Sequence, residues 1–355
     1  MVKRIAGRRA FMGGMAALGT CGLAARAMGA DLSNTIVLRD PGGSFRAGWT
    51  QAFYEPFTRE TGINVLPVTS SAEPTAEILM MVQDRSYLWD IAGAMTGTAL
   101  QKLVDNNAVE RHGLDHDPAV STIPPQYRTE YGIGSDVYST VCAWRTDRWL
   151  GHRPPHGWQD FWDTTRYPGA RGLRRDPMDM LELALMGDGV DPAHLYPLDL
   201  DRAFRCLDRI RAHVMAWWSS GAQGTNMIAS AEVDMVPIWN ARAAIAAHAG
   251  APVGISWEGN IWGVDYWMIL RGGPKVDLCR RFLSFVSDAR RQAAWTRFLA
   301  NGPVIPEAYD HIDPSIAITL PTYPSNHEKG VMTNSLYWVR NRDMVMERFL
   351  EWLAS

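Results

Sequence analysis

Residues 36–68, IVLRDPGGSFRAGWTQAFYEPFTRETGINVLPV, contain two apolar runs with a helical pattern between them. The first run, Ile36–Leu38, predicts a short strand, which the following Asp-Pro-Gly-Gly ends. An aromatic residue then recurs every four positions over the range Trp49–Phe57, and the pattern stops at Gly62. That spacing predicts an amphipathic helix with a glycine at its end. Ile63–Val68 alternates as a second strand, so the stretch predicts a strand–helix–strand unit.

The same order continues toward the C-terminus. Thr75–Val82 predicts a helix, Asp90–Ala94 a buried strand and Thr98–Val104 another helix. This βαβαβ order implies a parallel sheet with right-handed crossovers. Ligands of such sheets bind beyond the carboxyl ends of the strands. The candidate residues in those loops are Ser44, Phe45, Met95 and Thr96.

A second α/β region spans residues 172–262. It contains a predicted helix over Leu200–Met215 and a strand–helix unit over Val233–His248. After Val264 the chain returns to a strand pattern, which indicates re-entry into the first region. We therefore predict an α/β protein of two lobes, with lobe 1 formed by residues 31–140 and 264–309 and lobe 2 by 141–263 and 310–355.

Length and composition agree with two globular domains. The chain has 355 residues, of which 46% are hydrophobic and 21% charged, and domains hold roughly 150 residues each. Those figures exclude a disordered, collagenous or disulfide-rich chain. Beyond residue 30 the sequence holds 30 basic and 38 acidic side chains. Nucleic-acid binding needs clustered positive charge, so we expect no nucleic-acid partner. No polybasic membrane patch is present either.

Residues 1–30 predict an export signal that is removed. They are basic without acidic residues, and Arg8-Arg9 before a mild apolar run resembles the twin-arginine signal. The apolar run is too short to span a bilayer. Cleavage after Ala27 or Ala30 is expected, and a lipobox-like Leu-Gly-Thr before Cys21 leaves lipidation as an alternative. A basic tail without a targeting role is the other interpretation. Export predicts a periplasmic protein.

Catalytic and metal motifs are weak. The remaining cysteines, Cys142, Cys206 and Cys279, lie far apart and predict buried free thiols, with at most one bridge. No G-x-S-x-G, H-E-x-x-H or Walker motif occurs. The pairs His112/His116 and His152/His156 have helical spacing in loop-like or proline-containing settings. We predict no cofactor and no enzymatic activity, with an exported enzyme as the alternative from another class.

Several motifs, in order, resemble periplasmic polyamine-binding proteins of ABC importers. The matching segments are Thr58-Arg-Glu-Thr-Gly-Ile-Asn-Val65, Gly157-Trp-Gln-Asp-Phe-Trp162, Ile238-Trp-Asn240, Ala249-Gly-Ala-Pro252, Gly259-Asn-Ile-Trp262 and the tail from Leu320 to Leu353. The resemblance implies the two-lobed periplasmic-binding-protein fold, with a hinge and a ligand cleft between the lobes. It also implies a small-molecule ligand and an ABC permease as partners, and we expect a monomer.

The family's cleft holds amines with aromatic rings and carboxylates, and aromatic faces attract ammonium groups. The resemblance places Trp239 and Asp265 in that cleft. The family carries tryptophan where this chain has Gly263, and Trp262 stands one position earlier, so the ring that lines the cleft stays open. Core packing is the alternative role for both tryptophans.

The pair Asp176 and Asp179 matches the family's carboxylate pair at the same spacing. Arg174-Arg175 precede it, which is not the family's usual setting, and these arginines could neutralise the aspartates. Because Asp176 stands before Pro177, a helix N-cap is the alternative role.

Arg242 is the main departure from polyamine receptors, which have a small uncharged residue there. It follows Trp239 by three positions at a predicted helix start, so the two side chains share a face. The helix start and a guanidinium fork both favour a carboxylate. A carboxylate at Arg242 and an amine at Asp265 indicate a γ-aminobutyrate-like ω-amino acid, with spermidine or putrescine as the alternative. Pairing of Arg242 with Glu258 is the structural alternative.

Overall fold

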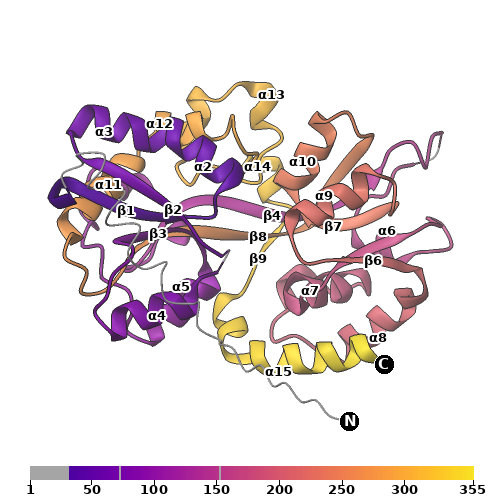
Figure 1. The fold of residues 1–355 in the computed structure, drawn as a ribbon. Helices are drawn as coiled ribbons and strands as arrows, with labels where there is room; N and C mark the ends of the chain where they lie inside the picture. Colours follow the sequence, from indigo (N-terminus) through magenta and orange to yellow (C-terminus); the bar gives the residue numbers. More distant parts are fainter. Residues whose placement is uncertain (1–31, 72, 152) are drawn as a thin grey trace, which may run out of the picture.

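The computed structural model describes residues 32–71, 73–151 and 153–355, coloured by sequence in Figure 1. The predicted signal over 1–30, with Arg8, Arg9, Cys21 and both cleavage points, lies outside these residues, and so does His152. The described strands form one nine-stranded sheet in the order β2-β1-β3-β8-β4-β7-β5-β6, with β9 beside β8. The strands are β1 (Thr35–Asp40), β2 (Asn64–Thr69), β3 (Ile91–Thr96), β4 (Ile133–Arg145), β5 (Arg171–Arg174), β6 (Val214–Trp218), β7 (Met235–Trp239), β8 (Val253–Ile269) and β9 (Val331–Met332).

The helices cover both faces of the sheet (Figure 1). They are α2 (Gly43–Trp49), α3 (Glu55–Thr61), α4 (Thr75–Gln83), α5 (Gly97–Asp105), α6 (Trp158–Trp162), α7 (Pro177–Gly187), α8 (Leu200–Ile210), α9 (Gly221–Ala229), α10 (Asn240–His248), α11 (Val276–Val286), α12 (Ala289–Trp295), α13 (Pro314–Ala317), α14 (Pro324–His327) and α15 (Ser335–Ala354). Short 3₁₀ turns lie at Leu32–Asn34, Val120–Thr122, Pro125–Tyr127, Pro192–His194, Arg211–His213 and Pro306–His311, and one π-helical turn at Thr50–Tyr54. Gly62, at a φ of 73°, ends α3 in the left-handed conformation that glycine tolerates best.

Two long strands connect the two halves of the sheet. β1, β2 and β3 pair in parallel at one end, and β5, β6 and β7 pair in parallel at the other. Between them β4 and β8 run antiparallel along each other, and the short β9 pairs with β8. The predicted parallel order is therefore present in both halves, and β4 and β8 run from one half to the other.

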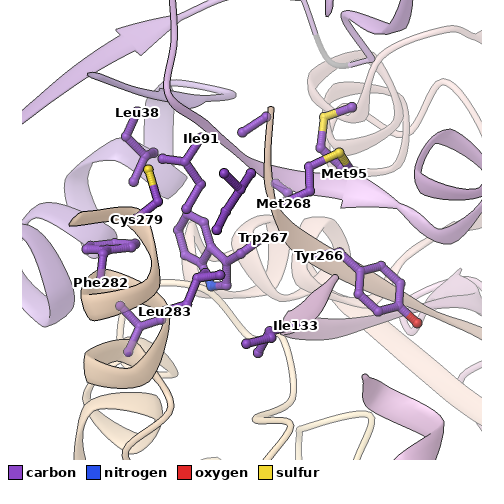
Figure 2. Close-up of a cluster of buried hydrophobic side chains, with 14 of the residues drawn as sticks. Leu38, Ile91, Met95, Ile133, Tyr266, Trp267, Met268, Cys279, Phe282 and Leu283 are labelled. Carbon is purple, nitrogen blue, oxygen red and sulfur yellow. The ribbon is translucent and has the colours of Figure 1, made fainter. Parts of the chain in front are cut away.

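The first half has its own core, centred on Trp267 of β8. Figure 2 shows this ring beside Ile91 of β3 and Phe282 of α11, while the ring of Tyr266 lies apart from that group. Trp49 of α2 lies 4.0 Å from Trp267 between ring centroids. We call this half lobe 1, comprising β1–β3, α2–α5, α11 and α12 with the adjoining part of β8.

The second half is built around two further clusters. One contains side chains of α6, α7, α8 and α15, and the other those of α9, α10 and β7. We call this half lobe 2. Residues 306–320 pack on α12 of lobe 1, where Ile312 and Leu320 cluster with Ala293. The residue boundaries of the lobes stay a prediction.

The predicted helix over Leu200–Met215 was too long. α8 ends at Ile210, and a 3₁₀ turn leads into β6 at Val214. The sequence of β6, Val-Met-Ala-Trp-Trp, contains the β-branched and aromatic residues that favour strands. The three cysteines of the described chain, Cys142, Cys206 and Cys279, are buried free thiols, as predicted.

Candidate functional site

Three neighbouring parallel strands of lobe 2 end in side chains that contact each other. Arg174 ends β5, Trp218 ends β6 and Trp239 ends β7. The Arg174 guanidinium carbon lies 5.6 Å from the Trp218 ring centroid and 5.2 Å from that of Trp239. The two rings meet edge to face at 5.3 Å. These carboxyl ends are where a doubly wound sheet binds its ligand, which is the position predicted for Trp239.

Arg242 lies in the first turn of α10, which starts directly after Trp239, as predicted. Its Nε atom lies against Gly221, the first residue of α9, where an added Cβ would come within 2.5 Å of it. No hydrogen bond or ion pair holds its guanidinium among the residues that the structure describes. Glu258, the alternative partner, pairs instead with Lys329 at 2.7 Å. Burial lowers the pKa of Arg242, and no acidic neighbour counteracts that effect.

Asp265 provides a carboxylate on the lobe 1 part of β8. Its residue is 8% exposed, and its oxygens accept no hydrogen bond within the described part of the chain. Burial raises the pKa of this carboxyl well above its usual range, and the nearby Asp136 and Glu73 raise it further. A buried acidic group without a partner is costly. It can be stabilised by a proton or by a bound cation.

Tyr138 of β4 lies between the two lobes. It pairs in register with Gly263 of β8, and an added Cβ at Gly263 would meet the Tyr138 hydroxyl at 2.6 Å. Burial raises the pKa of Tyr138, and both Asp179 and Asp265 raise it further, so the two carboxylates lie near enough to act on this hydroxyl. The ring of Tyr138 therefore fills the space beside Gly263, where the resembling family carries tryptophan.

Trp262 lies on the opposite face of β8 from Gly263 and Asp265, because successive side chains of a strand alternate. Its ring packs on His327 at 4.4 Å and near Tyr127 at 6.2 Å between centroids. Trp262 therefore packs in the core, which was the alternative role for this residue. The structure does not bring Trp262 together with Trp239.

The two aspartates of α7 have different surroundings. Asp176 caps the helix by accepting a hydrogen bond from the Met178 amide, and it pairs with Arg342 of α15 at 2.8 Å. This is the predicted N-cap role. Asp179 is 2% exposed, accepts a hydrogen bond from Thr140 at 2.8 Å and lies 3.7 Å from Arg174. Arg174 thus partly neutralises Asp179, as its sequence setting suggested.

The four lobe 1 candidates lie at the carboxyl ends of β1 and β3. Ser44 and Phe45 are in the first turn of α2, and Phe45 packs against Trp49 and Trp295. Met95 is buried, and its Sδ atom accepts from Arg39 at 3.5 Å. Thr96 caps α5 and donates to Glu73 at 2.9 Å. These residues border the region of Asp265, since Thr96 is its register partner.

Sequence reasoning did not identify four of the groups around the site, which are Tyr138, Asp136, Glu73 and Arg342. Only Asp136 could have been noticed in the sequence, because it is an acidic residue within the segment that forms the buried strand β4. Tyr138 and Arg342 gave no such signal. Their positions depend on the register of β4 against β8 and on where α15 docks.

Among the surface hollows of the described residues, three lie elsewhere and contain no predicted site residue. The first, of about 520 Å³, is lined by tyrosines and prolines around Tyr309, the second by polar residues around His156, and the third lies around Thr58. Within residues 32–355, the described side chains form no group of three or more His, Cys, Asp or Glu able to hold a metal ion. No helix of that part of the chain has the length and apolarity needed to cross a membrane.

Two lobes joined by crossing strands, with charged and aromatic groups at the strand ends, define a two-lobed receptor for a small molecule. The chain matches the bacterial extracellular solute-binding protein family over residues 52–322. It is 30% identical to the gamma-aminobutyric acid-binding protein of Pseudomonas aeruginosa, over 94% of this chain and 95% of that one. It is 24% identical to the spermidine/putrescine-binding periplasmic protein of Escherichia coli, over 79% and 81% of the two chains.

Among solved structures, an ABC transporter substrate-binding protein from Bradyrhizobium japonicum superposes with a TM-score of 0.84 at 30% identity, covering 90% of this chain and 99% of that one. The chain therefore belongs to the bacterial extracellular solute-binding protein family. The fold class and the family resemblance predicted from sequence are confirmed.

Proposed function

We propose that this protein is the solute-binding component of an ABC importer and that it captures a short ω-amino acid of the γ-aminobutyrate type. The match to the Bradyrhizobium substrate-binding protein supports the importer role. The similarity to a gamma-aminobutyric acid-binding protein over nearly the whole chain supports the ligand class.

One observation carries the choice of ligand. Arg242 of lobe 2 and Asp265 of the lobe 1 part of β8 are oppositely charged groups, and neither has a hydrogen bond or ion pair with a described residue. They do not pair with each other. On the lobe 2 side the Arg174 guanidinium lies over the Trp239 ring and 3.7 Å from Asp179, and, after burial, both Asp179 and Asp265 raise the pKa of Tyr138. A zwitterion with its charges at opposite ends would satisfy both groups at once.

A diamine satisfies only one of these groups. It would neutralise Asp265 but place a second positive charge near Arg242, already at the positive ends of two helices, α9 and α10. An unpaired buried charge costs roughly 3–5 kcal/mol, or about two to four orders of magnitude in affinity. The ω-amino acid should therefore bind more tightly than putrescine.

Calorimetric titration of γ-aminobutyrate and putrescine into wild type and Arg242→Ala tests this assignment. We expect the substitution to weaken γ-aminobutyrate at least about a hundredfold, from the cost of an unpaired charge, and to leave putrescine unchanged or tighter. Arg205→Ala, an exposed arginine of α8, is the matched control. If putrescine binds wild type more tightly and Arg242→Ala leaves γ-aminobutyrate unaffected, the polyamine alternative is correct.

We also propose that the protein works in the periplasm as a monomer and delivers its solute to an inner-membrane ABC permease. Periplasmic relatives support the location. Arg8-Arg9 and the small residues before Ala27 and Ala30 support twin-arginine export with removal of the signal. Membership of a family of solute-binding proteins supports a binding role without turnover.

A further inference from the structure

Asp136 and Asp265 face each other across the β4–β8 ladder. They are register partners next to a register shift between Gly134 and Asp136, and directly opposed residues of an antiparallel pair have their side chains on one face. Asp136 is 0% exposed and Asp265 is 8% exposed. Directly opposed residues in such a ladder have Cβ atoms roughly 4.5–5.5 Å apart. The sheet therefore holds two carboxyl groups side by side in a water-poor position.

The hydrogen bonds of the pair are unequal. Asp136 accepts from the Ser135 hydroxyl at 2.8 Å and from the Asn301 side-chain amide at 2.5 Å. Asp265 accepts none from the described residues, although it is the member that approaches the site. This arrangement anchors Asp136 and leaves Asp265 free for a ligand.

Charged and titratable groups from each neighbouring element face the pair. Arg39 of β1 is the cation that acts on Asp265, and Glu73, from the segment before α4, is a further acid. Burial raises the pKa of the Tyr138 and Tyr266 hydroxyls, and the nearby Asp265 raises both further. Both hydroxyls therefore stay neutral. One arginine thus faces three carboxyl groups.

Two adjacent carboxylates in a poorly solvated position cannot both stay ionised without a counter-charge. Burial raises the pKa of Asp136 to about 7 and that of Asp265 well above its usual range. Resting on the function proposed above, we propose that Asp136 is a second carboxyl of the amine subsite and that the empty receptor holds one proton on the Asp136–Asp265 pair. The ammonium group of the ligand displaces this proton.

The exchange conserves charge. The ligand enters as an ammonium ion with its own protons, the proton on the pair leaves to bulk water, and both aspartates become carboxylates. One positive charge replaces another, so the net charge around Arg39 and Glu73 stays constant. Asp136 need not contact the ligand. Its carboxylate adds a second negative charge beside Asp265, and the positive charge of the ammonium ion compensates for this added charge.

Calorimetric titration of γ-aminobutyrate in two buffers with different ionisation enthalpies, phosphate and Tris, measures proton release directly. We expect close to one proton released per ligand below pH 7. Affinity should rise about tenfold per pH unit there and level off above, because it follows the deprotonated fraction of the pair. The ligand's own groups do not titrate between pH 5.5 and 8.5, since carboxyl and amino groups ionise outside that range.

Asp136→Asn keeps the shape and one acceptor oxygen but removes the second carboxyl, so proton release and the change of affinity with pH should both be smaller than in wild type. Asp201→Asn, an exposed aspartate of α8, is the control and should behave as wild type. If Asp136→Asn does not fold, the two-buffer measurement on wild type decides alone. Binding without proton release, at an affinity constant from pH 5.5 to 8.5, refutes this inference and leaves the receptor function intact. If γ-aminobutyrate does not bind, the proposed function itself fails, and putrescine then tests the pair.

Discussion

Glu182 of α7 should make the stability of the protein fall as the pH rises. It is fully buried, and its Oε1 atom accepts hydrogen bonds from the Tyr196 hydroxyl and from the Trp338 indole N–H, each at 2.6 Å. Its Oε2 atom has no partner within the described residues. Burial, and after it the nearby Asp179, raise its pKa from 4.5 to about 8. The folded protein therefore keeps this carboxyl protonated near neutral pH.

The sign of the effect follows from proton binding. Between pH 4.5 and about 8 the folded state holds a proton that the unfolded state has lost. The free energy of unfolding therefore falls with rising pH, and the loss is complete above the folded-state pKa. A pKa difference of one between the folded and unfolded states corresponds to about 1.4 kcal/mol. The whole contribution is thus on the order of 5 kcal/mol between pH 4 and pH 9.

Urea unfolding of wild type and Glu182→Gln at pH steps from 4 to 9 isolates this group. Buried carboxyls that do not act on Glu182 contribute equally in both proteins, so the difference between the two free energies should shift in favour of the glutamine variant as pH rises. The steepest change expected is about 1.4 kcal/mol per pH unit. Glu347→Gln, an exposed glutamate of α15, should give a flat difference curve. A flat curve for Glu182→Gln as well would mean that Glu182 is already ionised in the folded protein, which refutes the reasoning.

Two further substitutions test the site. Gly221→Ala should weaken the binding of γ-aminobutyrate roughly ten- to a hundredfold, because the added methyl group displaces Arg242. In an Arg242→Ala background the same substitution should have no effect. Calorimetric titration of the single and double variants measures this non-additivity. Gly224→Ala, whose Cβ would meet Ile238 at 3.2 Å and Trp218 at 3.4 Å but not Arg242, is the control. Asp176→Ala should lower the free energy of unfolding by about 2 kcal/mol in urea through loss of its cap and of its pair with Arg342. Its ligand affinity should change less than twofold, and a large loss would place Asp176 in the ligand site.

Local patterns were sufficient for most of the elements. The spacing of aromatic residues from Trp49 to Phe57 and the glycine after them predicted the α2–α3 segment, and the start of α10 beside Trp239 was predicted from a strand running into a helix. The C-terminal end of α8 was missed. Helical periodicity and strand propensity compete there, and pairing of β6 with β5 decides the outcome.

The site was predictable only where its residues follow directly from an element's end. Arg242 belongs to that group, because helix geometry fixes its position relative to Trp239. The neighbours of Asp265 do not, since Asp136 and Tyr138 reach it through cross-strand register, which a single sequence leaves undetermined. The different roles of Trp262 and Gly263 depend on the same register.

The C-terminal helix has a mechanical consequence for any movement of the lobes. α15 starts with Ser335 close to Gly97 of lobe 1, and its later turns bury Val345 and Phe349 in lobe 2. Twenty helical residues form a stiff rod roughly 30 Å long. Because one end is embedded in lobe 2 and the other rests on α5, we expect any opening of the lobes to lift or pivot the lobe 1 end of this helix. A stiff helix in that place should limit how far the lobes separate, so we expect changes to the C-terminal helix to alter that range of motion.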